Sequence, residues 1–123
     1  MASFRQFEDI QASQKALDVT TEIYRLSNQG LFARDFGLRE QIRRASVSIM
    51  ANIAEGHGRR TNTEFANFLN ISRGSAAEVQ SHLHVANRLG YITPSEFDDL
   101  YARLTEISRM TLSLARYLRE SSG

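Results

Sequence analysis

Residues 38–54 read LREQIRRASVSIMANIA, and the spacing of the apolar residues in this stretch decides the fold class. Apolar side chains recur there every three or four positions, which places them on one face of an α-helix. These positions are Leu38, Ile42, Ala45, Ile49 and Ile53. The chain has a single proline, Pro94, and scattered glycines, so it lacks the dense turn signals that many short strands need. The sequence therefore predicts an all-α protein.

Capping residues and glycines divide the chain into four helical segments. Thr61 to Glu64 and Thr93 to Glu96 each have the spacing of a capping box, and Pro94 suits a first helical position. Gly30, the pair Gly56 and Gly58, and Gly90 mark the breaks. We expect helices over residues 7–28, 36–57, 62–89 and 94–119. Apolar lines also run along the other three segments: Ile10, Leu17 and Tyr24 beside Ala16, Ile23 and Leu26 in the first; Phe65, Leu69, Ala76, Val79, Leu83 and Ala86 in the third; and Phe97, Leu100, Leu104, Ile107, Leu114 and Leu118 in the fourth. Similar lengths and short connections predict an up-down-up-down antiparallel four-helix bundle.

Length and composition indicate one domain over residues 1–123. The chain has 41% hydrophobic and 24% charged residues, which excludes a disordered or fibrous protein, and a net charge of only +1. No run approaches the roughly 20 apolar residues of a membrane span. The absence of cysteine excludes disulfides and thiolate chemistry. The charged start of the chain does not resemble a signal peptide, so we expect a cytoplasmic protein without a membrane partner.

The middle of the second helix, residues 45–54, is uncharged, although the outward side of a bundle helix is normally polar. Val47, Met50 and Ala54 form a second apolar face, more than 60° around the helix from Ile42, Ile49 and Ile53. Contiguous exposed apolar surface usually marks an association site, which predicts a homo-oligomer. The alternative is a helix sunk more deeply in its own bundle.

A row of polar residues runs between these two faces. Its members are Gln41, Ser48, Asn52, Glu55 and Arg59. Such a row is typical of a hydrogen-bonded network between helices, with Glu55 paired to Arg59 one turn later. The alternative is an active-site row, in which Glu55 and Asn52 serve a small enzyme at the subunit interface.

Three parts of the chain, which together span nearly its whole length, resemble the 23S rRNA-intervening-sequence proteins, a four-helix-bundle family. The strongest match is GLREQIRRASVSIMANIAEG at residues 37–56, followed by Gly58 and Arg59. Residues 65–69, 71–75 and 78 are similar to the family's third-helix segment, and residues 7–10 with 15–16 to its opening. Met50-Ala51 departs from the family pattern, where we expect Pro-Ser or a similar pair.

This resemblance implies a left-handed up-down bundle that assembles as a homopentamer, with no established catalysis. Members are encoded within insertions in bacterial 23S rRNA genes or elsewhere in bacterial genomes. A similar fold serves as the accessory protein of diversity-generating retroelements, where it contacts reverse transcriptase and nucleic acid. We find no retroelement-specific feature in this sequence.

Metal and cofactor sites are not predicted. His82 and His84 lie two positions apart and so project about 200° apart on a helix, which prevents them from gripping one metal ion. Glu78 and His82 have the spacing of a surface pair, and a di-iron bundle would need two Glu-x-x-His motifs. His57 has no neighbouring Ser or Asp that would complete a triad.

Basic residues near the second helix are the candidate contacts to nucleic acid. Fourteen of the fifteen basic residues are Arg, whose planar fork suits phosphate, although genomic codon bias explains this composition equally well. The candidates are Arg34, Arg39, Arg43, Arg44, Arg59 and Arg60. In a ring, equivalent arginines would gather on one rim and bind RNA or DNA in a salt-sensitive way.

Taken together, these patterns predict a non-enzymatic, homo-oligomeric scaffold or adaptor. Its expected partners are other copies of the chain, RNA or DNA, or another protein. The rival hypotheses are the interface enzyme around Glu55 and Asn52 and a purely structural oligomer.

Overall fold

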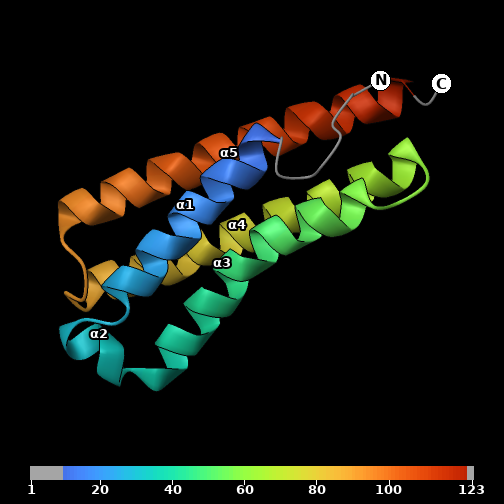
Figure 1. Ribbon diagram of the computed structural model, residues 1–123. Helices are drawn as coiled ribbons and strands as arrows, with labels where there is room; N and C mark the ends of the chain where they lie inside the picture. Colours follow the sequence, from blue (N-terminus) through green and yellow to red (C-terminus); the bar gives the residue numbers. More distant parts are fainter. Residues whose placement is uncertain (1–9, 122–123) are drawn as a thin grey trace.

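The computed structural model describes residues 10–121, which form five α-helices and no strand (Figure 1). The helices are α1 (Gln11–Leu26), α2 (Gly30–Arg34), α3 (Phe36–His57), α4 (Asn62–Arg88) and α5 (Pro94–Ser121). The all-α prediction is confirmed. No helix within the described part of the chain is both long and apolar enough to cross a membrane.

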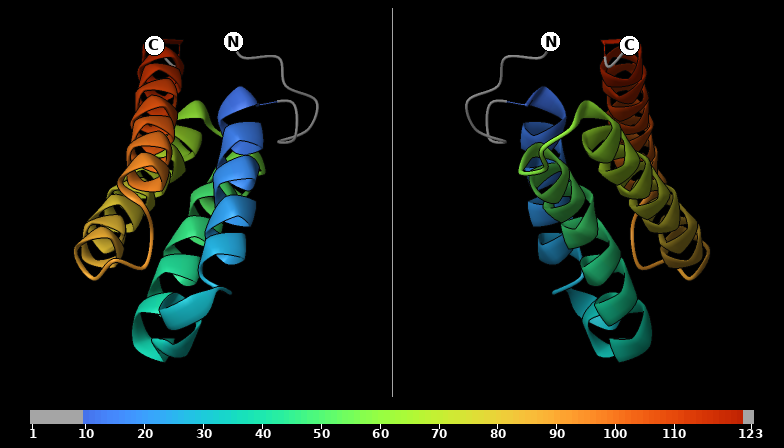
Figure 2. Two further views of the ribbon diagram at one scale, coloured as in Figure 1. Left: turned by 90° about the vertical axis from the view of Figure 1, so that its left-hand side faces the viewer. Right: turned by 90° about the vertical axis from the view of Figure 1, so that its right-hand side faces the viewer.

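The four long helices form an antiparallel bundle in which consecutive helices are neighbours. α1 and α3 lie side by side, as do α4 and α5, and the two pairs stand on opposite sides of the molecule (Figure 2). α4 packs along both α3 and α5, whereas the shorter α1 packs less extensively against α3 and α5. The end of α5 lies at the same end of the bundle as the start of α1 and the α3–α4 turn (Figure 1).

Side-chain caps fix the starts of three helices. At α4, Oγ1 of Thr61 accepts a hydrogen bond from the Glu64 amide at 3.1 Å. At α5 the capping box is reciprocal, because the Glu96 amide donates to Thr93 Oγ1 at 3.1 Å and the Thr93 amide donates to Glu96 Oε1 at 2.9 Å. Asp35 caps α3 by accepting from the Leu38 amide at 3.1 Å, and the sequence did not reveal this cap. Each cap satisfies an amide that the helix itself leaves unpaired.

The first predicted helix, residues 7–28, is shorter in the structure, and a short helix that was not predicted follows it. Ile10 lies outside α1, which begins at Gln11 and ends at Leu26 rather than at residue 28; residues 7–9 lie outside the described part of the chain. Gly30, with φ +54°, is not only a break between helices, because it is also the first residue of the short helix α2. α2 seats the buried Phe32 against the bundle, where its ring stacks on Tyr91 with centroids 5.4 Å apart.

The glycines of the predicted breaks have different roles. Gly90 follows the end of α4 with φ +74°, a left-handed conformation that favours glycine, so the predicted stop is confirmed. Gly56 does not end a helix; it lies buried inside α3, where an added Cβ would come within 2.7 Å of Phe68 Cβ. Gly58 follows α3 in an ordinary helical conformation, φ −79°.

The core fills the bundle along its whole length. The apolar lines predicted in α3, α4 and α5 are buried for the most part, with Leu38, Phe97 and Leu114 half-buried at the margins. The line predicted in α1 is partly wrong, because Leu17 and Tyr24 are 46% and 41% exposed. They share the outward side of α1, two turns apart, while Ala16, Ile23 and Leu26 are buried.

Candidate functional site

The outward side of α3 and α1 presents apolar side chains to solvent. Val47 is 42% exposed, whereas Met50 and Ala54 are half-buried and Met50 packs against the core. Val47 and Tyr24 together line a depression of ≈ 310 Å³, whose other walls are Glu40, Arg43 and Arg44. The structure therefore joins the predicted interface residue Val47 to exposed Tyr24 of α1, which the sequence pattern had placed in the core.

The polar row of α3 separates into two parts. Ser48 and Asn52 are half-buried between α3 and α4: the Ser48 hydroxyl lies 2.8 Å from that of Ser75, and Asn52 Nδ2 donates to Ser48 O and Oγ at 2.8 and 2.9 Å. Glu55 is exposed and forms the predicted ion pair with Arg59, at 3.2 Å. Gln41 is exposed about two turns before Ser48.

A second set of hydrogen bonds ties α3 to its neighbours through buried hydroxyls. Ser72 donates to Ile49 O at 2.8 Å, and Thr20 Oγ1 lies 2.7 Å from Ala16 O and 3.1 Å from Ser46 O. These small side chains satisfy buried polar groups and let the helices approach closely. The interior polar groups of α3 thus hold helices together, and none of them converges with Glu55 on a common cavity.

Three of the six candidate arginines are committed to contacts within the fold. Arg39 donates to Ala33 O at 2.9 Å, and Arg59 is held by Glu55. Arg43 donates from Nε to Ser27 Oγ at 2.8 Å and from Nη2 to Tyr24 O at 3.3 Å. All three guanidinium groups also lie over aromatic rings, those of Phe36, Tyr24 and Phe68.

The other three candidates, Arg34, Arg44 and Arg60, are exposed. No ion pair joins any of them to a carboxylate within residues 10–121. They do not form one cluster in a single chain, because Arg34 and Arg60 flank opposite ends of a helix of 22 residues, which is about 33 Å long.

The histidines are dispersed. His82 Nε2 lies 3.5 Å from Glu78 Oε2, which is too long for a good hydrogen bond, and this nitrogen is buried. The His57 ring meets the edge of Phe65. His84 packs against Phe97 and Tyr101 of α5, an aromatic cluster that the sequence did not predict. Within the described residues, no group of three potential metal ligands occurs.

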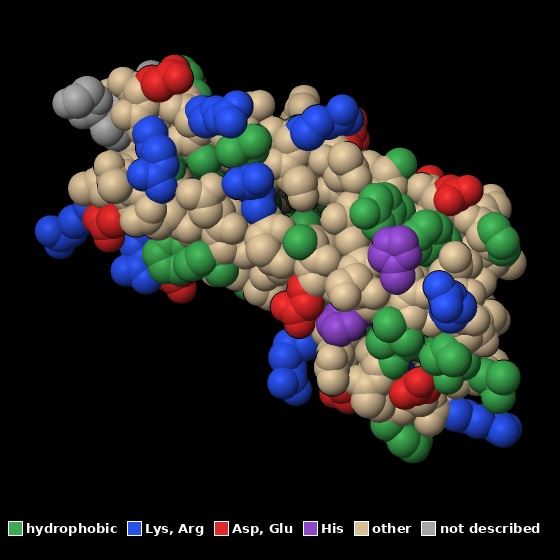
Figure 3. All heavy atoms as spheres, turned by 180° about the vertical axis from the view of Figure 1, so that it is seen from behind, with side chains coloured by type: hydrophobic (Ala, Val, Ile, Leu, Met, Phe, Trp, Pro, Cys, Tyr) green, Lys and Arg blue, Asp and Glu red, His purple; other side chains and the backbone are tan. Residues whose placement is uncertain are grey.

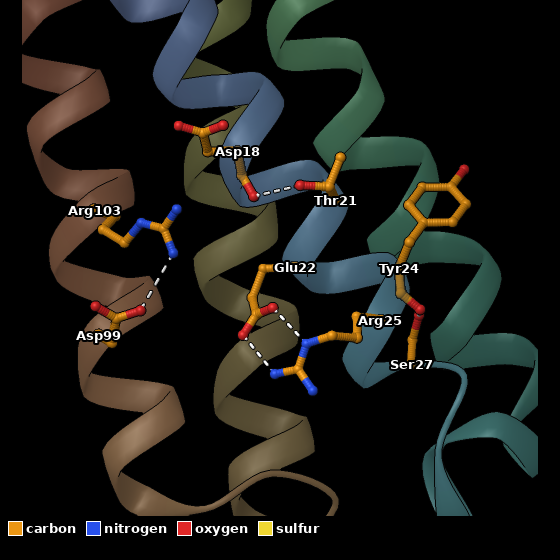
Figure 4. A network of polar contacts seen from close by, with 8 residues as sticks. All are labelled: Asp18, Thr21, Glu22, Tyr24, Arg25, Ser27, Asp99 and Arg103. Atoms are coloured by element: carbon orange, nitrogen blue, oxygen red, sulfur yellow. Dashed lines mark hydrogen bonds and ion pairs between the residues drawn. The ribbon is translucent and has the colours of Figure 1, made fainter.

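α1 and α5 carry ion pairs on their surface that were not predicted from the sequence (Figure 4). Glu22 receives two hydrogen bonds of 2.7 Å from Arg25, and these bonds lower the pKa of the Glu22 carboxyl. Arg103 pairs with Asp99 within α5 at 3.3 Å, while Lys15 of α1 reaches Glu106 of α5 at 3.1 Å. These pairs lie at the surface of the bundle, where an ion pair contributes little to stability.

A polar contact lies at the end of the bundle opposite the α3–α4 turn. The Tyr91 hydroxyl donates to Asp35 Oδ2 at 2.9 Å, which raises the pKa of Tyr91, and Asp35 Oδ1 caps α3. Asp35 thus couples the start of α3 to the α4–α5 turn.

The arrangement is that of a helical bundle, and comparisons with known proteins agree with this fold. The model of the 23S rRNA-intervening sequence protein family matches residues 8–113. The chain belongs to this family. The 1.70 Å crystal structure of an S23 ribosomal protein family member of unknown function from Bacteroides thetaiotaomicron VPI-5482 is similar, with a TM-score of 0.77 and 28% identity. The similarity covers 85% of this chain and 97% of that chain. No curated protein matches.

The crystallised relative is described as a protein of unknown function, and the name of the family carries no enzymatic activity. These similarities thus support the bundle and the family, and the chain's own surface is the basis for assigning a function.

Proposed function

We propose that this family member is a non-enzymatic, homo-oligomeric scaffold whose subunits meet through the outward apolar side of α3 and α1. The exposed Val47 beside Tyr24 carries this proposal, since both line one depression rimmed by Glu40 and Arg44. An apolar centre with a charged rim is typical of a subunit interface. A pentameric ring, as the family resemblance implies, would bury this surface against a second copy of the same chain.

We expect Val47→Glu to weaken the assembly, because a buried carboxylate without a partner at the interface is costly. Light scattering after gel filtration measures the mass: the unaltered protein should elute as an oligomer and the variant at a smaller mass. Val85→Glu is the matched control, because Val85 is 45% exposed on α4 against 42% for Val47. Monomeric unaltered protein at micromolar concentration would refute the scaffold.

The same proposal assigns nucleic-acid contact to the free arginines around α3. In an oligomer, Arg34, Arg44 and Arg60 would recur once in each subunit, so a chain of net charge +1 could still present a local positive field. We expect salt-sensitive binding of duplex DNA or structured RNA that weakens about tenfold or more in the Arg34→Gln/Arg44→Gln/Arg60→Gln variant. Fluorescence anisotropy at two salt concentrations measures this binding. Absence of binding by the unaltered oligomer would refute the nucleic-acid part of the proposal.

The interface enzyme around Glu55 and Asn52 receives no support from the geometry. Glu55 pairs with Arg59 in solvent, Asn52 is occupied by Ser48, and neither lines the depression at Val47.

A further inference from the structure

The boundary between α4 and α5 forms a long polar seam on the outside of the bundle. Three contacts mark its course: Arg119 donates to Asn67 Oδ1 at 2.7 Å, Gln80 donates to Thr105 Oγ1 at 3.0 Å, and His84 lies against Tyr101 with ring centroids 5.4 Å apart. Arg109 and Arg116 lie four and eleven residues after Thr105 and therefore share its side of α5. From Asn67 to Arg88 the seam is about 32 Å long.

Five arginines border this seam, and none of them is paired with a carboxylate among residues 10–121. They are Arg73, Arg88, Arg109, Arg116 and Arg119. Two of them have neutral partners, since Arg73 donates to Asn70 and Arg119 to Asn67. Nε of Arg73 is buried without a hydrogen-bond partner among the described residues.

Acidic residues are sparse along the seam. From Ile107 to Arg119, α5 contains no Asp or Glu, and from Phe65 to Arg88, α4 contains only Glu78, which lies next to His82. Asp98 and Glu120 stand at the two ends of α5. Figure 3 shows basic side chains gathered over the half of the molecule that holds the ends of the chain, with histidine and hydrophobic side chains over the other half.

The other half of the seam is aromatic. His84 of α4 contacts Phe97 and Tyr101 of α5, with ring centroids 5.0 and 5.4 Å apart, and the two α5 rings lie 5.4 Å from each other. His84 is exposed, and it borders a depression of ≈ 410 Å³. The depression is lined by His84, Val85, Asn87, Arg88 and Leu89.

We propose that the α4–α5 seam binds single-stranded nucleic acid, with arginines on the phosphates and an unpaired base against the exposed His84 ring. Basic side chains that follow the phosphates, together with an exposed aromatic ring for a base, are the combination that single-strand binders use. The guanidinium fork matches phosphate oxygens, and the seam carries no Lys. An acidic peptide would use the arginines but would gain nothing from the aromatic end. The seam is separate from the α3 arginines of the proposed function and does not depend on them.

The test uses a fluorescein-labelled 20-nucleotide oligo(dT) and the full-length protein, with anisotropy measured at several salt concentrations. We expect Arg109→Gln/Arg116→Gln/Arg119→Gln to weaken binding at least tenfold and to lower the slope of log K against log salt by about 2. The control removes the same charge elsewhere: Lys15→Gln/Arg25→Gln/Arg103→Gln, at three cations that form ion pairs on α1 and α5, should change oligo(dT) binding by no more than about twofold. Light scattering on both variants separates these effects from any loss of assembly.

A second variant tests the aromatic end without changing the arginines. His84→Ala should weaken oligo(dT) binding about fivefold or more with an unchanged salt slope, because a lost stacking contact releases no counterion. His84 is exposed, so the bundle should keep its helical content by circular dichroism.

Three outcomes would overturn the proposal. The first is no binding of oligo(dT) at low salt, and the second is equal weakening by the two triple variants. The third is an unaltered affinity in His84→Ala together with equal competition by poly-glutamate, which would identify the seam as a site for acidic polypeptide. If the α3 variant of the proposed function loses duplex DNA or structured RNA while the seam variant binds oligo(dT) as the unaltered protein does, the proposed function survives and the seam proposal does not.

Discussion

At the scale of single residues, Gly56 illustrates what a sequence pattern conceals. Two glycines close together after an apolar run indicate a helix end, yet Gly56 is buried within α3. An added Cβ would lie 2.7 Å from Phe68 Cβ and 2.9 Å from Phe65 Cδ1, so the absence of a side chain lets α4 approach. Only the distance between two helices distinguishes this role from a helix stop, and that distance is not encoded in local spacing.

We expect Gly56→Ala to destabilise the protein, because overpacking costs about 1–3 kcal/mol and outweighs the roughly 1 kcal/mol by which alanine favours a helix over glycine. Gly74→Ala is the control: Gly74 is exposed in the middle of α4 and its added Cβ would meet nothing within 4 Å. That variant should gain up to about 1 kcal/mol. Urea denaturation at equal protein concentrations compares them, and equal stabilities of the two variants would contradict the packing role of Gly56.

At the scale of helices, the sequence predicted the features that depend on residues close to one another in the chain. The Thr61 and Thr93 capping boxes define the starts of α4 and α5, and the three- to four-residue spacing identifies the core faces of α3, α4 and α5. α2 was missed because five residues cannot show a helical period. The sequence placed Leu17 and Tyr24 in the core because an apolar helix face has the same periodicity whether it is buried in the core or exposed at an interface.

The same division holds for the candidate sites on these helices. Glu55 and Arg59 were predicted as a pair from their spacing, and the pair is present at 3.2 Å. The cluster of His84, Phe97 and Tyr101 was not foreseen, since it depends on how α4 and α5 are rotated against each other. Phe97 and Tyr101 are four residues apart and thus share a side of α5, which is the one signal that the sequence offered.

At the scale of the whole molecule, the two surfaces assigned a role differ in the side chains on which each proposal rests. α1 and α3 present the apolar residues Leu17, Tyr24 and Val47, while the α4–α5 seam presents arginines and aromatic rings. These two surfaces lie on opposite sides of the molecule, because the α1–α3 pair stands opposite the α4–α5 pair (Figure 2). Assembly through the first would therefore leave the second open to a ligand.

If folding is linked to assembly in this way, stability must depend on protein concentration. Folded chains that bind one another are stabilised by mass action, so the Tm of the unaltered protein should rise as its concentration is raised from about 1 to 100 μM. Val47→Glu removes that linkage, and its Tm should stay constant over the same range, whereas Val85→Glu should behave like the unaltered protein. Differential scanning fluorimetry at graded concentrations measures all three. A concentration-independent Tm in the unaltered protein would mean that solvent, rather than a second copy of the chain, covers the apolar side of α3.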